Sequence, residues 1–342
     1  MQKFLFVFKV LLLCLVVIWG SVEIWSFKQF LTAPISSLPQ SKIVEIPKGA
    51  STKKVAEMLH AENLIRHPVW LRWYLKVRGK AQQIQAGEFE ISPSWTVSEL
   101  TEALVSGKTV SYPVTFIAGE TFKQSFNKLK DEPKLKHLHA RLDTDKLKSL
   151  LGIKLSKAHA LEGQLLPETY LYSAGDTDES VLLRAHEALQ KVLLSEWQNR
   201  DKGLPLKTPY EALILASIVE KETGSSAERP MIAGVFVNRL KKGMRLQSDP
   251  TVIYGIGDAY DGDIRKKDLL TKTAYNTYRI NGLPPTPIAL ASRDAIKAVM
   301  HPANTQALYF VATGKDGEHK FSNTLKEHNK AVRAYLNQQK LN

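Results

Sequence analysis

The first apolar run places the strongest constraint on what this chain can form. It extends from Phe4 to Val22 as FLFVFKVLLLCLVVIWGSV, and Lys9 is the single charged residue within it. A helix rises about 1.5 Å per residue, so a run of this length matches the hydrocarbon core of a bilayer, which is about 30 Å thick. Lys9 is close enough to the start for its side chain to reach the membrane surface. Residues 1–27 are therefore predicted to form a cytoplasmic tip and a transmembrane anchor.

The charges beside this run predict its orientation. Lys3 and Lys9 both lie toward its N-terminal end, and the cytoplasmic flanks of membrane helices are enriched in lysine and arginine. We expect a single-pass protein of a bacterial inner membrane, with its N-terminus in the cytoplasm and most of the chain outside. A cleaved signal peptide is the alternative. Bulky residues follow Gly20 and Ser21, so the run lacks a small-x-small cleavage site, which favours an uncleaved anchor.

The basic composition takes its meaning from this anchor. The chain has 47 Lys and Arg against 34 Asp and Glu, a net charge of +13. Such an excess is typical of proteins that bind nucleic acid, anionic membranes or acidic polymers. A body outside the membrane rarely meets nucleic acid, so we expect anionic lipid or an anionic wall polymer as its partner. Cys14 is the only cysteine, which excludes an intramolecular disulfide and a cysteine-based zinc site.

The remaining chain divides into a linker and two folded parts. Residues 28–40 contain prolines and serines without periodicity, which predicts a linker. Residues 41–110 show a strand, two amphipathic helices and a second strand, a βααβ order. Residues 111–342 follow as a larger mixed α/β domain, in which the Lys- and Leu-rich stretch 134–157 is predicted to be largely helical. The fold class is therefore α+β, behind a membrane helix.

One helix of the larger domain stands out because it has no polar face. Thr208, Pro209 and Glu211 form a helix start in which threonine caps, proline takes the first position and glutamate takes the third. The residues that follow, ALILASIV, are apolar on all sides, which predicts a buried helix. This helix ends in Glu220 and Glu222. It therefore carries two carboxyl groups at the edge of the core.

Glu220 is the expected catalytic residue. Burial and the negative end of the helix dipole both disfavour a carboxylate there, and a carboxyl group that stays protonated can act as a general acid. Ser217 lies one turn earlier and could donate a hydrogen bond to it. Glu222 points about 200° away around the helix axis, so the two glutamates do not form a pair on one face. The alternative is that both are the solvated end of a core helix.

Downstream polar residues are candidates for binding sugar or for orienting the acid. Amide, hydroxyl and phenol groups hydrogen-bond sugar hydroxyls, and aromatic faces stack on sugar rings. Ordinary turn chemistry is the alternative explanation for these residues. The substrate-binding or orienting candidates are Ser217, Glu222, Asn238, Gln247, Ser248, Asp249, Tyr278 and Asn281.

Several motifs in order resemble the YceG-like family of endolytic murein transglycosylases. The resemblance covers essentially the whole chain, and its motifs are LEGQLLPETY at 161–170, ASIVEKET at 216–223, LQSDPT at 246–251, YNTY at 275–278, GLPP at 282–285 and EHN at 327–329. It implies a small LysM-like domain near residues 41–107 and a catalytic domain after it. It also implies one catalytic glutamate, which maps onto Glu220, with no metal and no cofactor.

The resemblance further implies the reaction. A lytic transglycosylase cleaves the β-1,4 bond between N-acetylmuramic acid and N-acetylglucosamine in peptidoglycan, and leaves a 1,6-anhydro end. The enzyme would be a lyase of cell wall biogenesis that terminates nascent strands, with peptidoglycan synthases as partners. Two alternatives remain open at this point: a hydrolytic muramidase with Asp249 as second carboxylate, and a non-catalytic scaffold that binds glycan through Trp70, Trp73 and Trp95.

Overall fold

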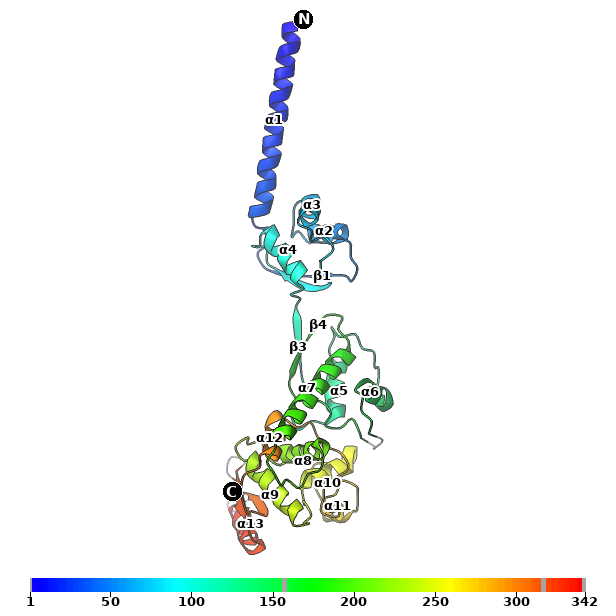
Figure 1. Cartoon of the computed structure of the whole chain (residues 1–342), viewed down its shortest axis with the longest axis vertical. Helices are drawn as coiled ribbons and strands as arrows, with labels where there is room; N and C mark the ends of the chain where they lie inside the picture. Colours follow the sequence, from blue (N-terminus) through cyan, green and yellow to red (C-terminus); the bar gives the residue numbers. More distant parts are fainter. Residues whose placement is uncertain (1, 156–158, 315–317, 340–342) are drawn as a thin grey trace. The chain divides into compact units, whose positions relative to one another are not determined.

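The computed structural model describes residues 2–155, 159–314 and 318–339. The chain divides into two compact units (Figure 1), the first containing residues 1–112 and 173–175 and the second residues 113–172 and 176–342. Helices predominate in both, and the strands of the described residues form three two-stranded sheets, β1–β2, β3–β4 and β5–β6. The class is thus mixed α and β.

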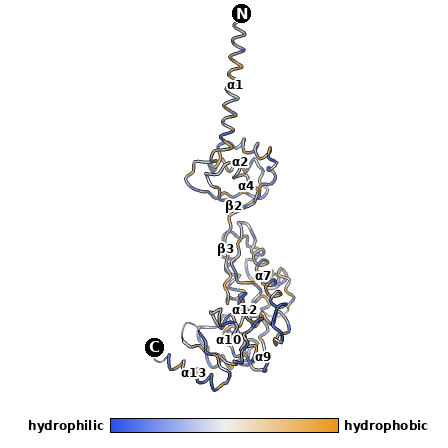
Figure 2. Tube along the Cα trace, turned by 60° about the vertical axis from the view of Figure 1, so that its left-hand side comes forward, coloured by the Kyte–Doolittle hydropathy of each residue, from blue (hydrophilic) through white to orange (hydrophobic). Residues whose placement is uncertain are grey.

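The first unit begins with the long helix α1, Gln2–Thr32. Its segment Leu11–Thr32 is long and apolar enough to cross a membrane, and the most apolar 18-residue window of that segment has no buried residue. Figure 2 shows hydrophobic positions recurring along α1. The helix continues to Thr32, so the first part of the expected linker is helical. Ile35 is buried in the core of the first unit and its amide donates to Trp95 O, so the rest of the expected linker packs against the domain.

A small α/β core forms the remainder of this unit. Its elements are β1 (Lys42–Ile46), α2 (Thr52–Ala61), α3 (Pro68–Val77), β2 (Gly87–Ile91) and α4 (Val97–Ser106). The strands are antiparallel and Lys42 pairs with Ile91. The strand, helix, helix, strand order is the one read from the sequence, and its likeness to a LysM domain stays a prediction. Alternate strand residues such as Val44 and Phe89 pack with the helices, which leaves Glu45 exposed on the other face of the sheet.

The second unit is mostly helical. Its elements are β3 (Ser111–Thr115), which the unit boundary crosses, α5 (Phe122–Lys130), α6 (Thr144–Leu150), β4 (Thr169–Ser173), α7 (Asp178–Asn199), α8 (Pro209–Glu222), α9 (Arg229–Lys241), α10 (Asp249–Ile256), η1 (Gly257–Ala259), α11 (Lys266–Leu270), α12 (Arg293–Met300), β5 (Tyr309–Ala312), β6 (His319–Ser322) and α13 (Leu325–Gln339). The antiparallel hairpin β5–β6 contacts α13.

The expectation of a long helix over 134–157 was wrong for the described part of that stretch. Only α6 is helical there, and residues 156–158 lie outside the described residues. The cause is Asp178 in the first turn of α7, whose carboxylate accepts the backbone amides of Leu138 and His139 at 3.1 Å each. Those amides cannot join a helix ladder while they bind a side chain. Asp143 then caps α6 by accepting the amide of Lys146.

The predicted buried helix, α8, is confirmed. Residues 212–220 are all buried, and α8 packs against α7, α9, α10 and α12. Thr208 caps it by accepting the amide of Glu211. The carboxylate of Glu211 binds the amide of Lys207 rather than that of Thr208, so only half of the expected capping box forms. The helix is thus packed against four others, and Glu220 and Glu222 lie at its C-terminal end.

Candidate functional site

Glu220 lies where the end of α8 meets the beginnings of α9 and α12. Its Oε1 accepts a hydrogen bond from Arg229 Nη2 at 2.8 Å, and its Oε2 accepts the amide of Ser292 at 2.9 Å. The hydroxyl of Ser292 is a third donor. Ser292 caps α12, so the carboxylate lies at the start of that helix, and Arg229 lies in the first turn of α9. These contacts join three helices.

Ser217 does not orient Glu220. Its hydroxyl donates to Ile214 O at 2.7 Å and accepts the amide of Ile288 at 3.0 Å, and the residue is fully buried. Asn238 has a similar role, because its side-chain amide donates to the carbonyls of Thr305 and Ala307. Both residues tie the core helices to the segments beside them. Ser217 and Asn238 thus bind backbone groups inside the fold, and Glu220 binds the side chain of Arg229.

Glu222 is in a different environment. It is partly buried at the last residue of α8, and its Oε1 accepts a hydrogen bond from the hydroxyl of Ser248 at 2.5 Å. The pKa of Glu222 is raised to about 7, mainly by burial and also by the neighbouring carboxylate of Asp249, while the Ser248 hydrogen bond and the charge of Arg239 act in the opposite direction. A carboxyl group with this pKa is protonated in a large fraction of molecules at neutral pH, which suits proton transfer.

Glu222 opens onto a groove of about 400 Å³. The groove brings together four of the predicted candidates, since Ser248 binds Glu222 at its edge and Gln247, Asp249 and Tyr278 line it. The hydroxyl of Tyr278 donates to Asp249 Oδ1 at 2.7 Å. Asn281 lies outside the lining and accepts a hydrogen bond from Arg245. The full lining is Glu222, Arg239, Leu246, Gln247, Asp249, Tyr278, Tyr309, Phe310, Leu325, His328 and Asn329.

Gln247 carries an uncommon backbone conformation in this groove. Its φ is +51°, in the left-handed region that non-glycine residues rarely adopt. Such residues gather at functional sites, where the surrounding structure holds them in place. The amide of Gln247 donates to Thr277 O, and that of Ser248 donates to the Thr277 hydroxyl. The YNTY segment thus holds the turn that presents Gln247 and Ser248 to Glu222.

Arg239, Tyr309 and His328 form a cluster in the groove and were not among the predicted site residues. Arg239 is buried, donates to the carbonyls of Leu308 and Leu246, and lies 5.2 Å from the ring of Tyr309. His328 stacks on Tyr309 at 5.2 Å, and its Nδ1 has no hydrogen-bond partner among the described residues. Burial lowers the pKa of His328, and Arg239 adds to this effect. The available signal was the EHN motif at 327–329, whose His328 and Asn329 line the groove.

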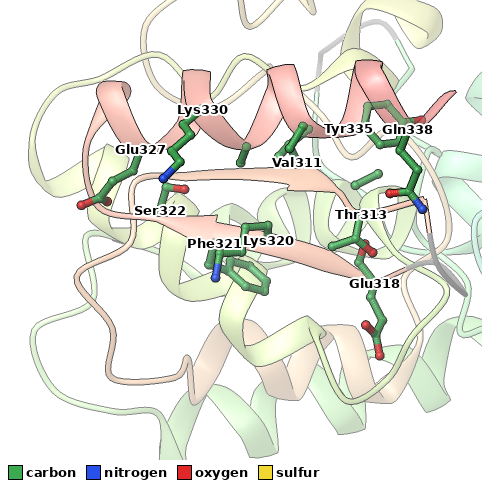
Figure 3. Close-up of a pocket in the computed structure, with 13 residues that line it drawn as sticks. Val311, Thr313, Glu318, Lys320, Phe321, Ser322, Glu327, Lys330, Tyr335 and Gln338 are labelled. Atoms are coloured by element: carbon green, nitrogen blue, oxygen red, sulfur yellow. The ribbon is translucent and has the colours of Figure 1, made fainter. Parts of the chain in front are cut away.

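A larger cavity of about 780 Å³ lies between α13 and the β5–β6 hairpin. Figure 3 shows Glu327 and Lys330 on the helix above Ser322 and Lys320 of the hairpin. None of the predicted site residues lines it. The two cavities use different faces of α13, because His328 and Asn329 face the groove of Glu222. We take the smaller one as the candidate active site, since it contains Glu222, a carboxyl group with a raised pKa, together with other predicted site residues.

Comparisons with known proteins agree with the motifs. The model of the YceG-like family matches residues 44–334. The endolytic murein transglycosylase of Bacillus subtilis (strain 168) is 33% identical over 307 residues, which is 86% of this chain and 84% of the relative. The Streptococcus pneumoniae D39 protein of the same name is 30% identical over 325 residues, and 58% of its length is covered. A crystal structure of a yceG-like protein from Listeria monocytogenes has a TM-score of 0.54 at 31% identity, and covers 85% of this chain and 99% of that one.

Proposed function

Because the chain belongs to the YceG-like family, we propose that it is a peptidoglycan lytic transglycosylase held at the bacterial inner membrane by α1. The names of its relatives support the substrate, since the protein of Bacillus subtilis is an endolytic murein transglycosylase. The observation that carries the proposal is the position of Glu222. It combines a raised pKa with access to a groove lined by amide, phenol and imidazole groups.

The proposed acid is Glu222 rather than Glu220. A general acid needs a transferable proton and access to the substrate. Glu220 has an ion pair with Arg229 and two donors from Ser292, and its side chain is 5% exposed. Glu222 has one hydroxyl donor and faces the groove. In this proposal Glu220 has a structural role, and Glu222 has the catalytic role that the sequence analysis assigned to Glu220.

The reaction needs no second protein carboxylate. Glu222 gives its proton to the glycosidic oxygen, the bond from that oxygen to C1 of the muramoyl sugar breaks, and the leaving sugar gains a 4-hydroxyl. The carboxylate then accepts the proton of the muramoyl 6-hydroxyl, whose oxygen bonds to C1. The product is a 1,6-anhydro end, no water is consumed, and Glu222 is protonated again. Because the nucleophile belongs to the substrate, its effective concentration at C1 is very high.

The groove supplies groups that suit an acetylated sugar chain. Tyr278 and Tyr309 offer aromatic faces, and Gln247 and Asn329 offer amide groups. The imidazole of His328 also lines the groove. The carboxylate of Asp249 is held by Tyr278 and acts mainly on the pKa of Glu222. We assign these residues to binding and positioning in the proposed enzyme.

Cellular placement follows from α1. With the N-terminus in the cytoplasm, the chain after α1 lies on the outer side of the membrane, where new glycan strands are made. Cleavage there would terminate nascent strands, and the synthases of those strands would be the natural partners. Lipid and glycan both carry negative charge, which suits the net charge of +13.

The mass of the products tests this proposal. Purified glycan strands are digested with the full-length protein in detergent, and the new ends are identified by mass spectrometry. We expect ends that are one water lighter than reducing ends. Reducing ends would instead indicate a hydrolytic muramidase, for which Asp249 in the same groove is the available second carboxylate. Glycan binding without any product would indicate a scaffold.

A further inference from the structure

We propose that the outer face of α3 lies in the headgroup layer of the membrane beside α1. This face consists of Val69, Trp73 and Val77, which are 63%, 64% and 67% exposed. They recur every four residues and form one stripe along α3, while Leu71 and Leu75 on the opposite side are fully buried. The inference rests on the membrane anchoring proposed for α1 and does not depend on the reaction.

Aromatic contacts fix the distance between α3 and the membrane helix. The ring of Trp70 lies 5.6 Å from Phe27 and 5.5 Å from Phe30 of α1, and His67 stacks on Trp70 at 4.2 Å. All of these residues belong to the first unit. The start of α3 is therefore packed against the last turns of α1, and the depth of those turns in the bilayer sets the depth of α3.

Phe27 lies near the outer edge of the lipid headgroup layer. The uninterrupted apolar run ends at Val22, and Phe27 follows about 7.5 Å further along the helix axis. The headgroup layer extends roughly 5–7 Å beyond the hydrocarbon on each side. If the apolar segment is instead taken to Thr32, Phe27 lies deeper still. Either boundary brings the beginning of α3 to the membrane surface.

The chemistry of the α3 face matches that surface. Tryptophan is the residue most typical of the membrane interface. Arg72 and Lys76 lie beside the stripe, and α3 itself contains no acidic residue. A shallow cavity of about 430 Å³ next to Trp73 is lined by Lys53, Arg72 and Lys76. A helix with an apolar stripe and cationic flanks is the pattern of proteins that lie on anionic bilayers.

The consequence is a second membrane contact. A single α1 would leave the first unit free to pivot, whereas a docked α3 holds that unit against the bilayer. The occupant of the α3 face is an anionic lipid bilayer. A glycan strand is the competing ligand for exposed tryptophans, and the experiment below separates the two.

A depth measurement on the full-length chain tests the inference. In a Cys14→Ser background, Val77→Cys on the α3 face and Glu45→Cys on the outer face of the sheet are each labelled with an environment-sensitive fluorophore. The protein is reconstituted in phosphatidylcholine vesicles with or without phosphatidylglycerol, and a nitroxide on the lipid headgroup serves as quencher. We expect strong quenching at position 77 and little at position 45, with the contrast greatest in phosphatidylglycerol.

Charge variants provide the matched control. Replacing Arg72 and Lys76 by glutamine is expected to weaken docking by about fivefold per residue, since each basic side chain near an anionic surface contributes about that much. Raised salt should have a similar effect. Floated protein with equal quenching at positions 77 and 45 would overturn the inference. So would a label at 77 that responds to added glycan strands instead of lipid. Protein that does not float with the vesicles would contradict the anchor itself.

Discussion

Glu220 and Glu222 are two residues apart at the end of α8, and their carboxyl groups have partners of different chemistry. Glu220 is ion-paired with Arg229 at 2.8 Å inside the core, whereas Glu222 receives one hydroxyl hydrogen bond from Ser248 at the edge of a groove. The helix turns by about 200° between them, which sends one side chain to the junction of three helices and the other to the groove. Substitution of Glu220 should therefore act mainly on stability, and substitution of Glu222 mainly on catalysis.

Glu222→Gln is expected to remove glycan cleavage while the fold is retained. Glutamine has the same shape and can still accept the Ser248 hydrogen bond, but it has no proton to transfer. Loss of a general acid lowers kcat by roughly 10²–10⁴-fold. Product formation is measured by mass spectrometry and folding by thermal melting. Normal cleavage by this variant would refute the assignment.

Glu220→Gln is expected to affect stability first. The change leaves the largely buried Arg229 with only the more distant carboxylate of Asp294, 3.7 Å away, and breaking a buried pair costs roughly 3 kcal/mol. Activity per folded molecule should fall far less than in Glu222→Gln. Chemical denaturation with a parallel activity assay distinguishes the two. If Glu220→Gln melts like the wild type and is inactive, Glu220 is the acid and the proposal fails.

The pH profile should depend on Asp249. The acid must be protonated, and burial raises the pKa of Glu222 to about 7, so kcat/KM should decline as pH rises through that value. The Asp249 carboxylate contributes to the increase. Asp249→Asn should therefore move the decline to lower pH, while Ser248→Ala removes a hydrogen bond that lowers the pKa and should move it to higher pH. Rates measured from pH 5 to about 9 test both directions.

The same pKa shift predicts a pH-dependent stability. The folded-state pKa of Glu222 is above its unfolded value of 4.5. Folded molecules then bind more protons between these two values, so stability decreases as pH rises from about 4.5 to about 7. Glu222→Gln removes this dependence and should melt at a higher temperature than the wild type at pH 8. Identical melting curves above and below this window would contradict the raised pKa.

Two tyrosines of the YNTY segment form a matched pair of variants. Tyr278 donates to Asp249 in the groove, whereas Tyr275 donates to or accepts from Thr286 in the core. Tyr278→Phe is expected to lower kcat/KM by about tenfold, because a hydrogen bond to a charged group contributes about 1.5–3 kcal/mol. Tyr275→Phe should cost about 1 kcal/mol of stability and leave kcat/KM unchanged. Equal kinetic effects would place Tyr278 outside the site.

Much of this protein could be predicted from local patterns. The apolar run predicts α1 because its composition alone decides whether a segment can span a bilayer. The apolar run after Thr208 predicts the buried α8 for a similar reason, since a helix without a polar face must be covered. The stretch 134–157 shows the limit. Asp178, about 40 residues further along the chain, binds the amides of Leu138 and His139 and prevents a helix that the local sequence favours.

The sequence by itself determined that two glutamates end a buried helix and that polar residues cluster in the segments after it. Only the tertiary structure decided what surrounds each of them. Arg229 and Ser292 come to Glu220 from the starts of two other helices, and Ser248 comes to Glu222 from a turn held by the YNTY segment. Helical periodicity gives the angle between two side chains on one helix. The pKa of Glu222 depends on burial and on groups far away in sequence, which only packing brings together.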